Sequence, residues 1–198
     1  ETGKNAFDFL IANSGNRRNL EVDFFGGEPL MNWEVVKKLV AYGRQEEKLY
    51  DKKFRFTLTT NGVLLNDEIQ DFLNREMSNV VLSIDGRKKI HNQMRPFRGG
   101  QDSYDRIVPK FQRLAESRGQ QRYYARGTFT RNNLDFSQDV LHIADLGFKQ
   151  ISVEPVVAQP TDDYALREED LPKLFAEYDR LAAEMVRRMG TDEDFNFF

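Results

Sequence analysis

The segment LEVDFFGGEPLMN, residues 20–32, changes character halfway along its length. Its first half alternates apolar and acidic residues, which is typical of a β-strand. Gly26 and Gly27 can then adopt backbone angles that other residues rarely adopt. Pro29 lacks the N–H that a continuing strand would donate. Glu28 is left as a lone carboxylate beside backbone carbonyl groups. Because all these groups only accept hydrogen bonds, the pattern favours a cationic ligand such as an ammonium, with an ordinary glycine turn as the alternative.

The same segment does not fit a phosphate. A phosphate site needs backbone N–H groups and a helix N-terminus. No P-loop Lys-Ser/Thr pair follows the glycines, and no G-x-G-x-x-G motif occurs in the chain. These absences argue against nucleoside-triphosphate and dinucleotide sites.

Strand-like and helical patterns alternate along the rest of the chain. This alternation predicts parallel strands joined by right-handed crossovers. The expected fold is therefore α/β, with about five parallel strands and helices outside, as an open doubly wound sheet or a partial (β/α) barrel. We expect strands at 20–25, 54–60, 79–84, 122–130 and 150–156, and loops at 91–101 and 157–167. An opening helix is expected to stop at Gly15, and further helices are expected at 31–49, 66–76, 102–117, 136–146 and 168–189. Asn66 can cap the second of the connecting helices, and Asp102 or Ser103 the third.

Polar residues recur at alternate positions of all five strands, although parallel strands covered on both faces usually read as continuous apolar runs. We interpret Glu21 and the strand threonines as residues of exposed strand ends. A second group is assigned to a shared polar lumen, because burying unpaired polar groups is costly. That group is Ser83, Asp85, Arg126 and Glu154.

The carboxyl ends of the strands gather the acids Glu28, Asp85 and Glu154, with Asn61 beside them. Ligands bind at this edge in barrels and in open α/β sheets. Three carboxylates require a cationic partner, supplied by the ligand or by Arg126.

Composition excludes several classes of function. The chain has 198 residues with 29 basic and 32 acidic residues interspersed, so neither a nucleic-acid footprint nor a membrane-surface patch is expected. No apolar run approaches the length of a membrane span, and no signal-peptide pattern opens the chain. With no cysteine, disulfides and cysteine-ligated metals are excluded within this chain, which fits the cytoplasm.

The two histidines show no metal-ligand spacing, so no metal site is expected. We interpret His91 as a solvated loop residue and His142 as an ordinary helix residue. Residues 87–89, RKK, are expected to form a solvated turn, and Trp33 to pack at a helix start.

Five motifs together resemble the radical S-adenosylmethionine (SAM) enzymes. They are FFGGEPLMN, TLTTNG, SIDG with the following IHNQMR, RGTFT and VEPV, in that order. The chain more closely resembles the SPASM branch, whose members carry a further cluster domain and modify ribosomal peptides. Within that branch it is most similar to the maturases of six-cysteine (SCIFF) peptides.

The resemblance implies a partial (β/α) barrel whose GGEP segment holds the methionyl ammonium of SAM. Gly26, Gly27, Glu28 and Pro29 would then form that segment. Ser83 and Asp85 would lie near the ribose, and Arg126 is the candidate for the methionyl carboxylate. Asn61 and Glu154 would line the lumen.

One departure from the family limits what this chain can do. The family holds a [4Fe-4S] cluster on a Cys-x₃-Cys-x₂-Cys loop, and this chain has no cysteine. We therefore expect a fragment: residues 1–190 as an incomplete barrel and 191–198 as the start of a linker to a missing C-terminal cluster domain. No cofactor is expected to be bound in the fragment, which should be inactive and could self-associate through an open barrel edge.

The parent protein, by resemblance, would cleave SAM reductively and form sulfur-to-α-carbon thioether links in a Cys-rich precursor peptide. Two other readings remain open from the residues alone. One is a barrel hydrolase that uses Glu28 and Glu154 as paired carboxylates. The other is a module that binds a peptide at its open sheet edge.

Overall fold

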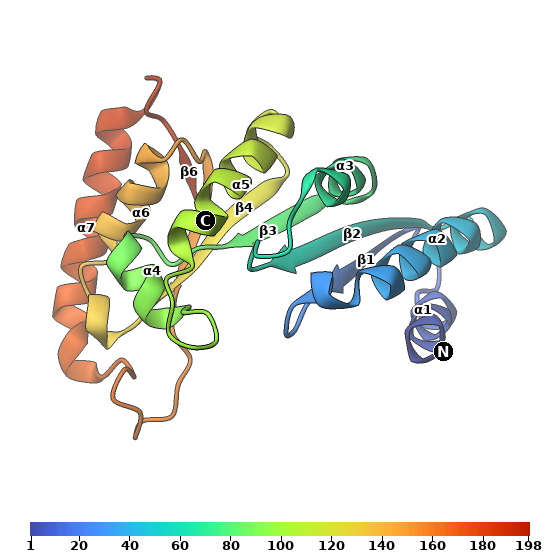
Figure 1. Cartoon of the computed structure of the whole chain (residues 1–198), viewed down its shortest axis with the longest axis horizontal. Coiled ribbons are helices and arrows are strands. Elements are labelled where there is room, and N and C mark those ends of the chain that lie inside the picture. Colours follow the sequence, from blue (N-terminus) through green and yellow to red (C-terminus); the bar gives the residue numbers. More distant parts are fainter. The chain divides into compact units, whose positions relative to one another are not determined.

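The computed structural model describes residues 1–198 and divides them into two compact units, residues 1–81 and 82–198 (Figure 1). The division falls inside strand β3 (Asn79–Ser83). No linker composition marks the boundary in the sequence, because a boundary within a strand keeps the apolar character of that strand.

Unit 1 begins with a helix and then builds parallel strands. β1 and β2 pair in parallel, with Leu20 opposite Phe54 and Phe24 opposite Leu58. The Ser78 N–H donates to the Phe56 carbonyl, which brings the start of β3 beside β2. The elements are α1 (Thr2–Asn13), β1 (Asn19–Phe24), the 3-10 helix η1 (Pro29–Asn32), α2 (Trp33–Tyr50), β2 (Lys53–Thr60), α3 (Asp67–Glu76) and the first half of β3.

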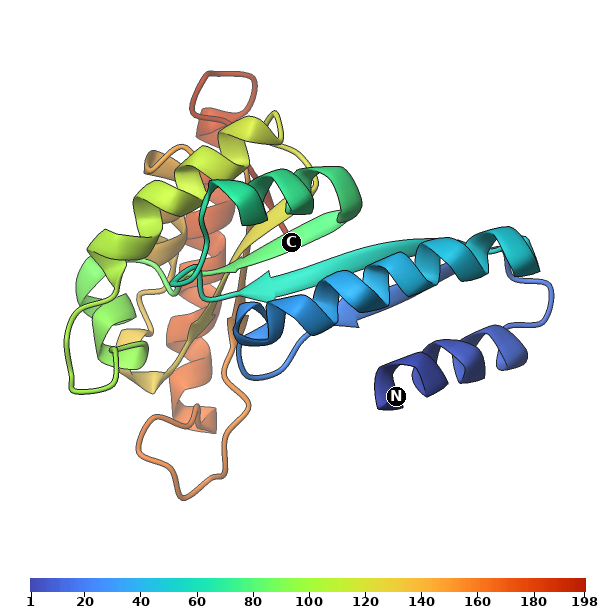
Figure 2. The same ribbon diagram turned by 45° about the vertical axis from the view of Figure 1, so that its right-hand side comes forward.

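The core of unit 1 is an aromatic cluster between helices and strands. The rings of Phe7 in α1 and Phe54 in β2 lie 5.1 Å apart, and Phe54 stacks on Phe56. Gly43 of α2 lies against this cluster, since a Cβ there would come within 2.7 Å of Phe7 and 2.8 Å of Phe56. This close approach places α2 along the strand pair, as Figure 2 shows.

Unit 2 continues the parallel arrangement. β4 pairs with β5, placing Arg126 opposite Ser152 and Thr128 opposite Glu154. The Ile84 N–H donates to the Arg126 carbonyl and joins the end of β3 to β4. The elements are the second half of β3, α4 (Lys88–Met94), α5 (Tyr104–Ser117), β4 (Tyr123–Phe129), η2 (Arg131–Asn133), α6 (Ser137–Asp145), β5 (Gln150–Pro155), η3 (Glu168–Asp170), α7 (Leu171–Arg188) and β6 (Asn196–Phe197).

Helices of unit 2 bury apolar faces against its strands. α6 packs on β5 and on α7, and α6 and α7 lie side by side in both Figure 1 and Figure 2. α7 buries Leu174 and Leu181, seven residues apart on one helix face. Strand β4 alternates buried and more exposed residues, so its apolar side faces the helices and Arg126 lies on the other side.

The α/β class with parallel strands and outer helices is confirmed, but the number of strands is not. Six strands form instead of about five. The additional strand, Asn196–Phe197, pairs with β5 and lies within the segment expected to begin a linker. Two residues are too short to show a strand period. The neighbouring Phe198 ring lies 5.1 Å from that of Tyr124.

The expected loop at 91–101 is also corrected, because α4 occupies Lys88–Met94. Capping was predicted well at Asn66, whose side chain accepts the Ile69 N–H at 2.9 Å, whereas Ser103 makes no side-chain cap bond. β1 ends the strand order of unit 1, so one edge of it has no paired strand. Self-association through that edge, the linker role of 191–198 and a cytoplasmic location stay predictions. Every helix is too short or too polar to cross a membrane.

Candidate functional site

Gly26 and Gly27 form the turn that ends β1. Both have positive φ, +91° and +57°, a region that residues with a side chain rarely adopt. A Cβ at either position would meet nothing within 4 Å. Glycine is therefore needed for the backbone conformation, and the open space leaves both residues exposed.

Glu28 is held by three hydrogen bonds that all come from unit 1. Its Oε1 accepts the Thr60 hydroxyl at 2.8 Å and the Leu30 N–H at 3.1 Å. Its Oε2 accepts the Asn61 N–H at 2.7 Å. The carboxylate therefore joins the carboxyl end of β1 to that of β2. Pro29 follows as the first residue of η1, where its missing N–H costs nothing.

These bonds leave Glu28 with spare acceptor capacity. A carboxylate offers about four acceptor positions, so one remains on Oε2. No Lys or Arg pairs with Glu28, and its three donors are neutral. This donor set fits an ammonium. It supplies nothing for an iron-sulfur cluster, because the chain contains no cysteine.

Asn61 contributes in a way that the sequence did not indicate. Its backbone N–H binds Glu28, and its side-chain Oδ1 accepts the Val63 N–H at 3.0 Å within its own turn. The Nδ2 amide group and one acceptor position of Oδ1 stay available to a ligand. The neighbouring Thr60, buried at 1% exposure, was missed because a strand threonine carries no sequence signal for this role.

Asp85, at the end of β3 in unit 2, has a different environment. Arg95 donates to both of its oxygens, at 2.6 Å and 3.0 Å, and the Thr128 N–H donates to Oδ1 at 3.1 Å. The Asp85 side chain is 3% exposed. We expected the cationic partner of this acid to be the ligand or Arg126, but in the structure it is Arg95. No local pattern indicated this pair, because Arg95 follows the end of α4 and meets Asp85 only through the fold.

His91 is not the solvated loop residue that we expected. It is buried in α4, where its Nδ1 accepts the Asp85 N–H at 3.3 Å and its Nε2 lies 3.1 Å from the Ser103 hydroxyl. Burial is the main cause that lowers the pKa of His91 from 6.5 to about 4, because the protonated ring would lose its hydration. His91 is therefore neutral at pH 7.

Arg126 and Glu154 meet across β4 and β5. The guanidinium donates to Glu154 at 2.6 Å, and both side chains are about half exposed, at 46% and 49%. Glu154 therefore already has a cationic partner. Ser83 lies at the end of β3 and is half-buried. These positions agree with a polar face on unit 2, while Glu21, 70% exposed and paired with Arg55, lies in solvent as expected.

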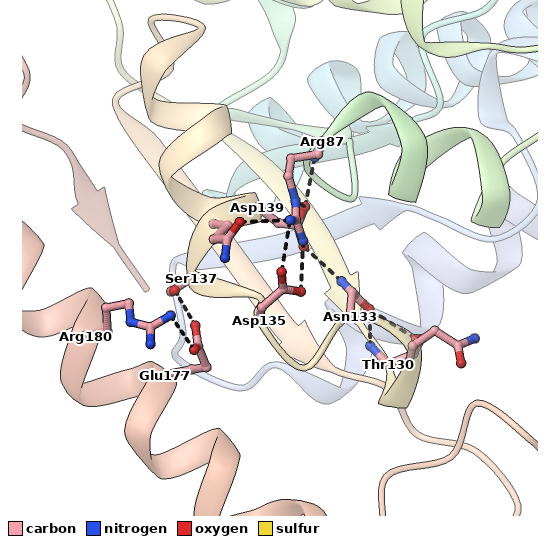
Figure 3. Close-up of polar contacts among 10 residues, drawn as sticks. Arg87, Thr130, Asn133, Asp135, Ser137, Asp139, Glu177 and Arg180 are labelled. Atoms are coloured by element: carbon pink, nitrogen blue, oxygen red, sulfur yellow. Dashed lines mark hydrogen bonds and ion pairs between the residues drawn. The ribbon is translucent and has the colours of Figure 1, made fainter.

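Residues 87–89 are not a solvated turn throughout. Figure 3 shows Arg87 reaching Asp135 and Asp139 from the turn after β3. Asp139 is fully buried and also accepts from Asn133, whose Oδ1 caps Thr130 at the end of β4. The side-chain bonds to Asp139 and then Asp135 raise the pKa of Arg87. Gly86 lies against Asp139, since a Cβ on this residue would come within 2.3 Å of the Asp139 side chain.

Each unit thus assembles its own share of the predicted residues. Unit 1 brings together Gly26, Gly27, Glu28, Pro29 and Asn61, and unit 2 holds Ser83, Asp85, Arg126 and Glu154. The two carboxylates of the hydrolase reading, Glu28 and Glu154, belong to different units. No group of three or more His, Asp or Glu side chains in residues 1–198 is placed to hold a metal ion.

Two sequence relatives share part of the chain. The radical SAM cyclopropyl synthase TigE of Paramaledivibacter caminithermalis is 26% identical over 164 residues, which cover 75% of this chain and 33% of that protein. The cysteine-type anaerobic sulfatase-maturating enzyme of Clostridium perfringens is 35% identical over 89 residues, 42% of this chain and 23% of the enzyme. The chain therefore spans a third or less of these relatives.

Solved structures share the fold. The structure of native anSMEcpe with bound AdoMet and the Kp18Cys peptide superimposes with a TM-score of 0.83 at 19% identity, covering 98% of this chain and 54% of that one. Streptococcus suis SuiB bound to S-adenosylmethionine superimposes with a TM-score of 0.65 at 14% identity, covering 98% and 42%. The family model of the radical SAM superfamily matches residues 11–124, more than half of the chain. With that match and the parallel α/β fold, the chain belongs to the radical SAM superfamily.

Proposed function

We propose that this chain is the SAM-binding part of a radical SAM peptide maturase. One observation carries the proposal: Glu28 is a positioned carboxylate with three neutral donors, no ion pair and one acceptor position left. An ammonium has three donors and no acceptor, so it complements the remaining oxygen and the exposed glycine carbonyls.

The other predicted residues take roles that their contacts allow. Gly26 and Gly27 offer backbone carbonyls in an exposed turn, and Asn61 offers its Nδ2 group. Ser83 is proposed near the ribose. Arg126 is proposed for the methionyl carboxylate, which it would bind in exchange for, or together with, its bond to Glu154.

Asp85 is the exception among the proposed contacts. Its oxygens are occupied by Arg95 and by the Thr128 N–H, and the side chain is buried. We therefore propose that Asp85 supports the ribose site indirectly rather than by touching SAM.

When SAM and a [4Fe-4S] cluster are bound, they supply the radical that abstracts a hydrogen from the substrate. The residues of this chain would bind and orient SAM for that chemistry, since they include no cysteine to hold the cluster. We propose that the chain on its own is inactive and binds SAM weakly, because the cluster provides the other half of the anchor.

A peptide is the proposed substrate of the whole protein. The structure of native anSMEcpe contains the bound Kp18Cys peptide, which supports this class of substrate. On the basis of the motif resemblance we propose a Cys-rich precursor peptide and sulfur-to-α-carbon thioether links.

The test of the ammonium role is a charge-neutral substitution. Glu28→Gln in the full-length protein, with its cluster reconstituted anaerobically, keeps the side-chain shape but removes the charge. We expect the Kd for SAM to rise about 10- to 100-fold, as when a hydrogen bond to a charged group is lost. Isothermal calorimetry measures the affinity, and chromatography of 5′-deoxyadenosine measures SAM cleavage.

Glu21→Gln is the matched control, because it removes the same charge from β1 at an exposed position. It should bind SAM as the wild type does. Equal affinity of Glu28→Gln and Glu21→Gln would remove the ammonium role from Glu28. Thioether formation is tested separately, by mass spectrometry of a Cys-rich precursor peptide after incubation with the wild-type protein.

A further inference from the structure

The helix α4 carries a motif that the proposed SAM contacts do not use. His91 lies in α4 and Arg95 is the residue at its C-terminal end, and both bind Asp85. These bonds tie α4 to the turn that follows β3.

Four residues close a ring of hydrogen bonds. Arg95 donates to the Asp85 carboxylate, and the Arg95 carbonyl accepts the Ser103 hydroxyl at 2.6 Å. Because Ser103 gives its only hydrogen to that carbonyl, its oxygen accepts from His91 Nε2. Nδ1 of His91 then accepts the Asp85 N–H, which returns to the start of the ring. Every polar group of the ring is satisfied in one tautomer of a neutral histidine.

The ring is also joined to strand β4. Asp85 Oδ1 accepts the Thr128 N–H at 3.1 Å, and the Ile84 N–H donates to the Arg126 carbonyl at 2.8 Å. Gly127 allows this approach, since a Cβ there would come within 2.4 Å of the Ile84 carbonyl oxygen. The ring therefore lies where the carboxyl ends of β3 and β4 meet.

We propose that Arg95 is a positioning residue that acts through Asp85. By holding the Asp85 carboxylate, it keeps the end of β3 in register with β4. Ser83 lies two residues before Asp85, and Arg126 lies two residues before Thr128, so their relative placement depends on this register. The cofactor part of the inference rests on the proposed function, whereas the register part rests on the fold alone.

An arginine is suited to this position because its planar guanidinium binds both carboxylate oxygens at once. A lysine keeps the charge but can present only a point contact. We therefore expect the protection of the Thr128 amide and the affinity for the cofactor analogue to be highest in wild type, intermediate in Arg95→Lys and lowest in Arg95→Ala.

The first experiment measures hydrogen exchange at single amides in this chain. In Arg95→Ala the Thr128 amide should exchange at least about tenfold faster than in wild type, because its acceptor is no longer held. Arg98→Ala is the matched control: Arg98 is an exposed arginine three residues further along the same segment. In Arg98→Ala the exchange rate of the Thr128 amide should stay within about twofold of the wild-type rate.

The second experiment measures the affinity of the full-length, cluster-loaded protein for S-adenosylhomocysteine by calorimetry. We expect Arg95→Ala to bind about tenfold more weakly, Arg95→Lys to recover part of the loss, and Arg98→Ala to bind as wild type does. Melting temperatures of all variants separate lost positioning from lost folding. If Arg95→Ala does not fold, the same measurements are made on Arg95→Lys and on Ser103→Ala. Ser103→Ala removes the hydroxyl that links the Arg95 carbonyl to His91.

The outcomes separate this inference from the proposed function. Unchanged Thr128 exchange in Arg95→Ala, or in both substitute variants, overturns the positioning role even if SAM binding is confirmed. If wild type fails to bind S-adenosylhomocysteine, the proposed function is wrong, and the exchange series still decides whether Arg95 sets the register. Faster exchange with unchanged affinity would overturn the link to Ser83 and Arg126.

Discussion

Glu28 and Asp85 are two carboxylates that follow the ends of parallel strands, yet they are built differently. Glu28 is half-buried and accepts from a hydroxyl and two backbone N–H groups. Asp85 is buried and its charge is neutralised by Arg95. A carboxylate without an internal cation keeps its attraction for a charged ligand, whereas a neutralised one serves the fold. The difference therefore separates a ligand-binding acid from a structural acid.

The largest expected effect is at Asp85, the buried member of its pair with Arg95. Arg95→Met leaves the Asp85 charge buried without its cation and should lower the free energy of unfolding by about 3 kcal/mol. Urea unfolding followed by far-UV circular dichroism measures it. The double variant Asp85→Leu/Arg95→Met should recover at least half of that loss, because no unpaired charge remains. A double variant that is less stable than Arg95→Met would contradict a structural role of the pair's charges.

The neutral histidine beside Asp85, His91, makes the stability of the fold depend on pH. Between pH 6.5 and about 4 the unfolded chain binds a proton at His91 that the folded chain does not. The free energy of unfolding should therefore fall as the pH falls through this range, by up to about 3 kcal/mol, and rise again with pH.

Urea titrations at several pH values compare wild type with His91→Gln. In the variant, the free energy of unfolding should change less steeply with pH. Burial also lowers the pKa of His142, so His142→Gln is the control and should keep the steeper, His91-dependent part of the slope. A wild-type slope in His91→Gln would assign the dependence to other groups.

A smaller effect is expected where Glu28 meets β2. Thr60→Val removes the donor to the Glu28 carboxylate and the acceptor of the Gly62 N–H, so it should cost about 2 kcal/mol, in keeping with two hydrogen bonds. Trp33 is the only tryptophan and packs 4.9 Å from the Phe72 ring, so its fluorescence reports unfolding of unit 1. Thr59→Val, on the neighbouring residue, should change the transition less. Equal shifts in both variants would mean that the Thr60 bonds add nothing.

The smallest effect is expected at the exposed pair on β4 and β5. Arg126→Gln should change the free energy of unfolding by less than about 1 kcal/mol, because both partners are half exposed and water screens them. The difference in free energy between Arg126→Gln and wild type should shrink further in 0.5 M salt, because the screening length there is only on the order of 4 Å. A loss as large as that of Arg95→Met would show that exposure does not distinguish the two pairs.

Much of the fold followed from local patterns. Alternating strand and helix periods predicted the α/β class, and Asn66 was recognised as a cap because its amide can accept an N–H three residues later. The missed elements are short. α4 has seven residues, about two helical turns, and β6 has two residues, so each gives only a weak periodic signal. α4 packs on α5, and β6 pairs with β5.

Local sequence patterns also pointed to part of the candidate site. The GGEP turn and Asn61 were found because glycine, proline and a lone acid are unusual at a strand end. Thr60, Arg95 and the burial of His91 were missed, since an ordinary threonine, arginine or histidine acquires its role only from the partner that the fold brings to it.

The sequence by itself determined the parallel α/β class, the acceptor-only turn at Gly26–Glu28 and the absence of cluster ligands, because backbone preference and side-chain chemistry are local properties. Only the tertiary structure decided which acid is neutralised. Asp85 meets Arg95 and Thr128 because the turn after β3 lies against both the C-terminal end of α4 and strand β4, while Glu28 meets only neutral donors from the end of β2 and its own turn. Charge compensation depends on distance in space, and that distance is set by packing.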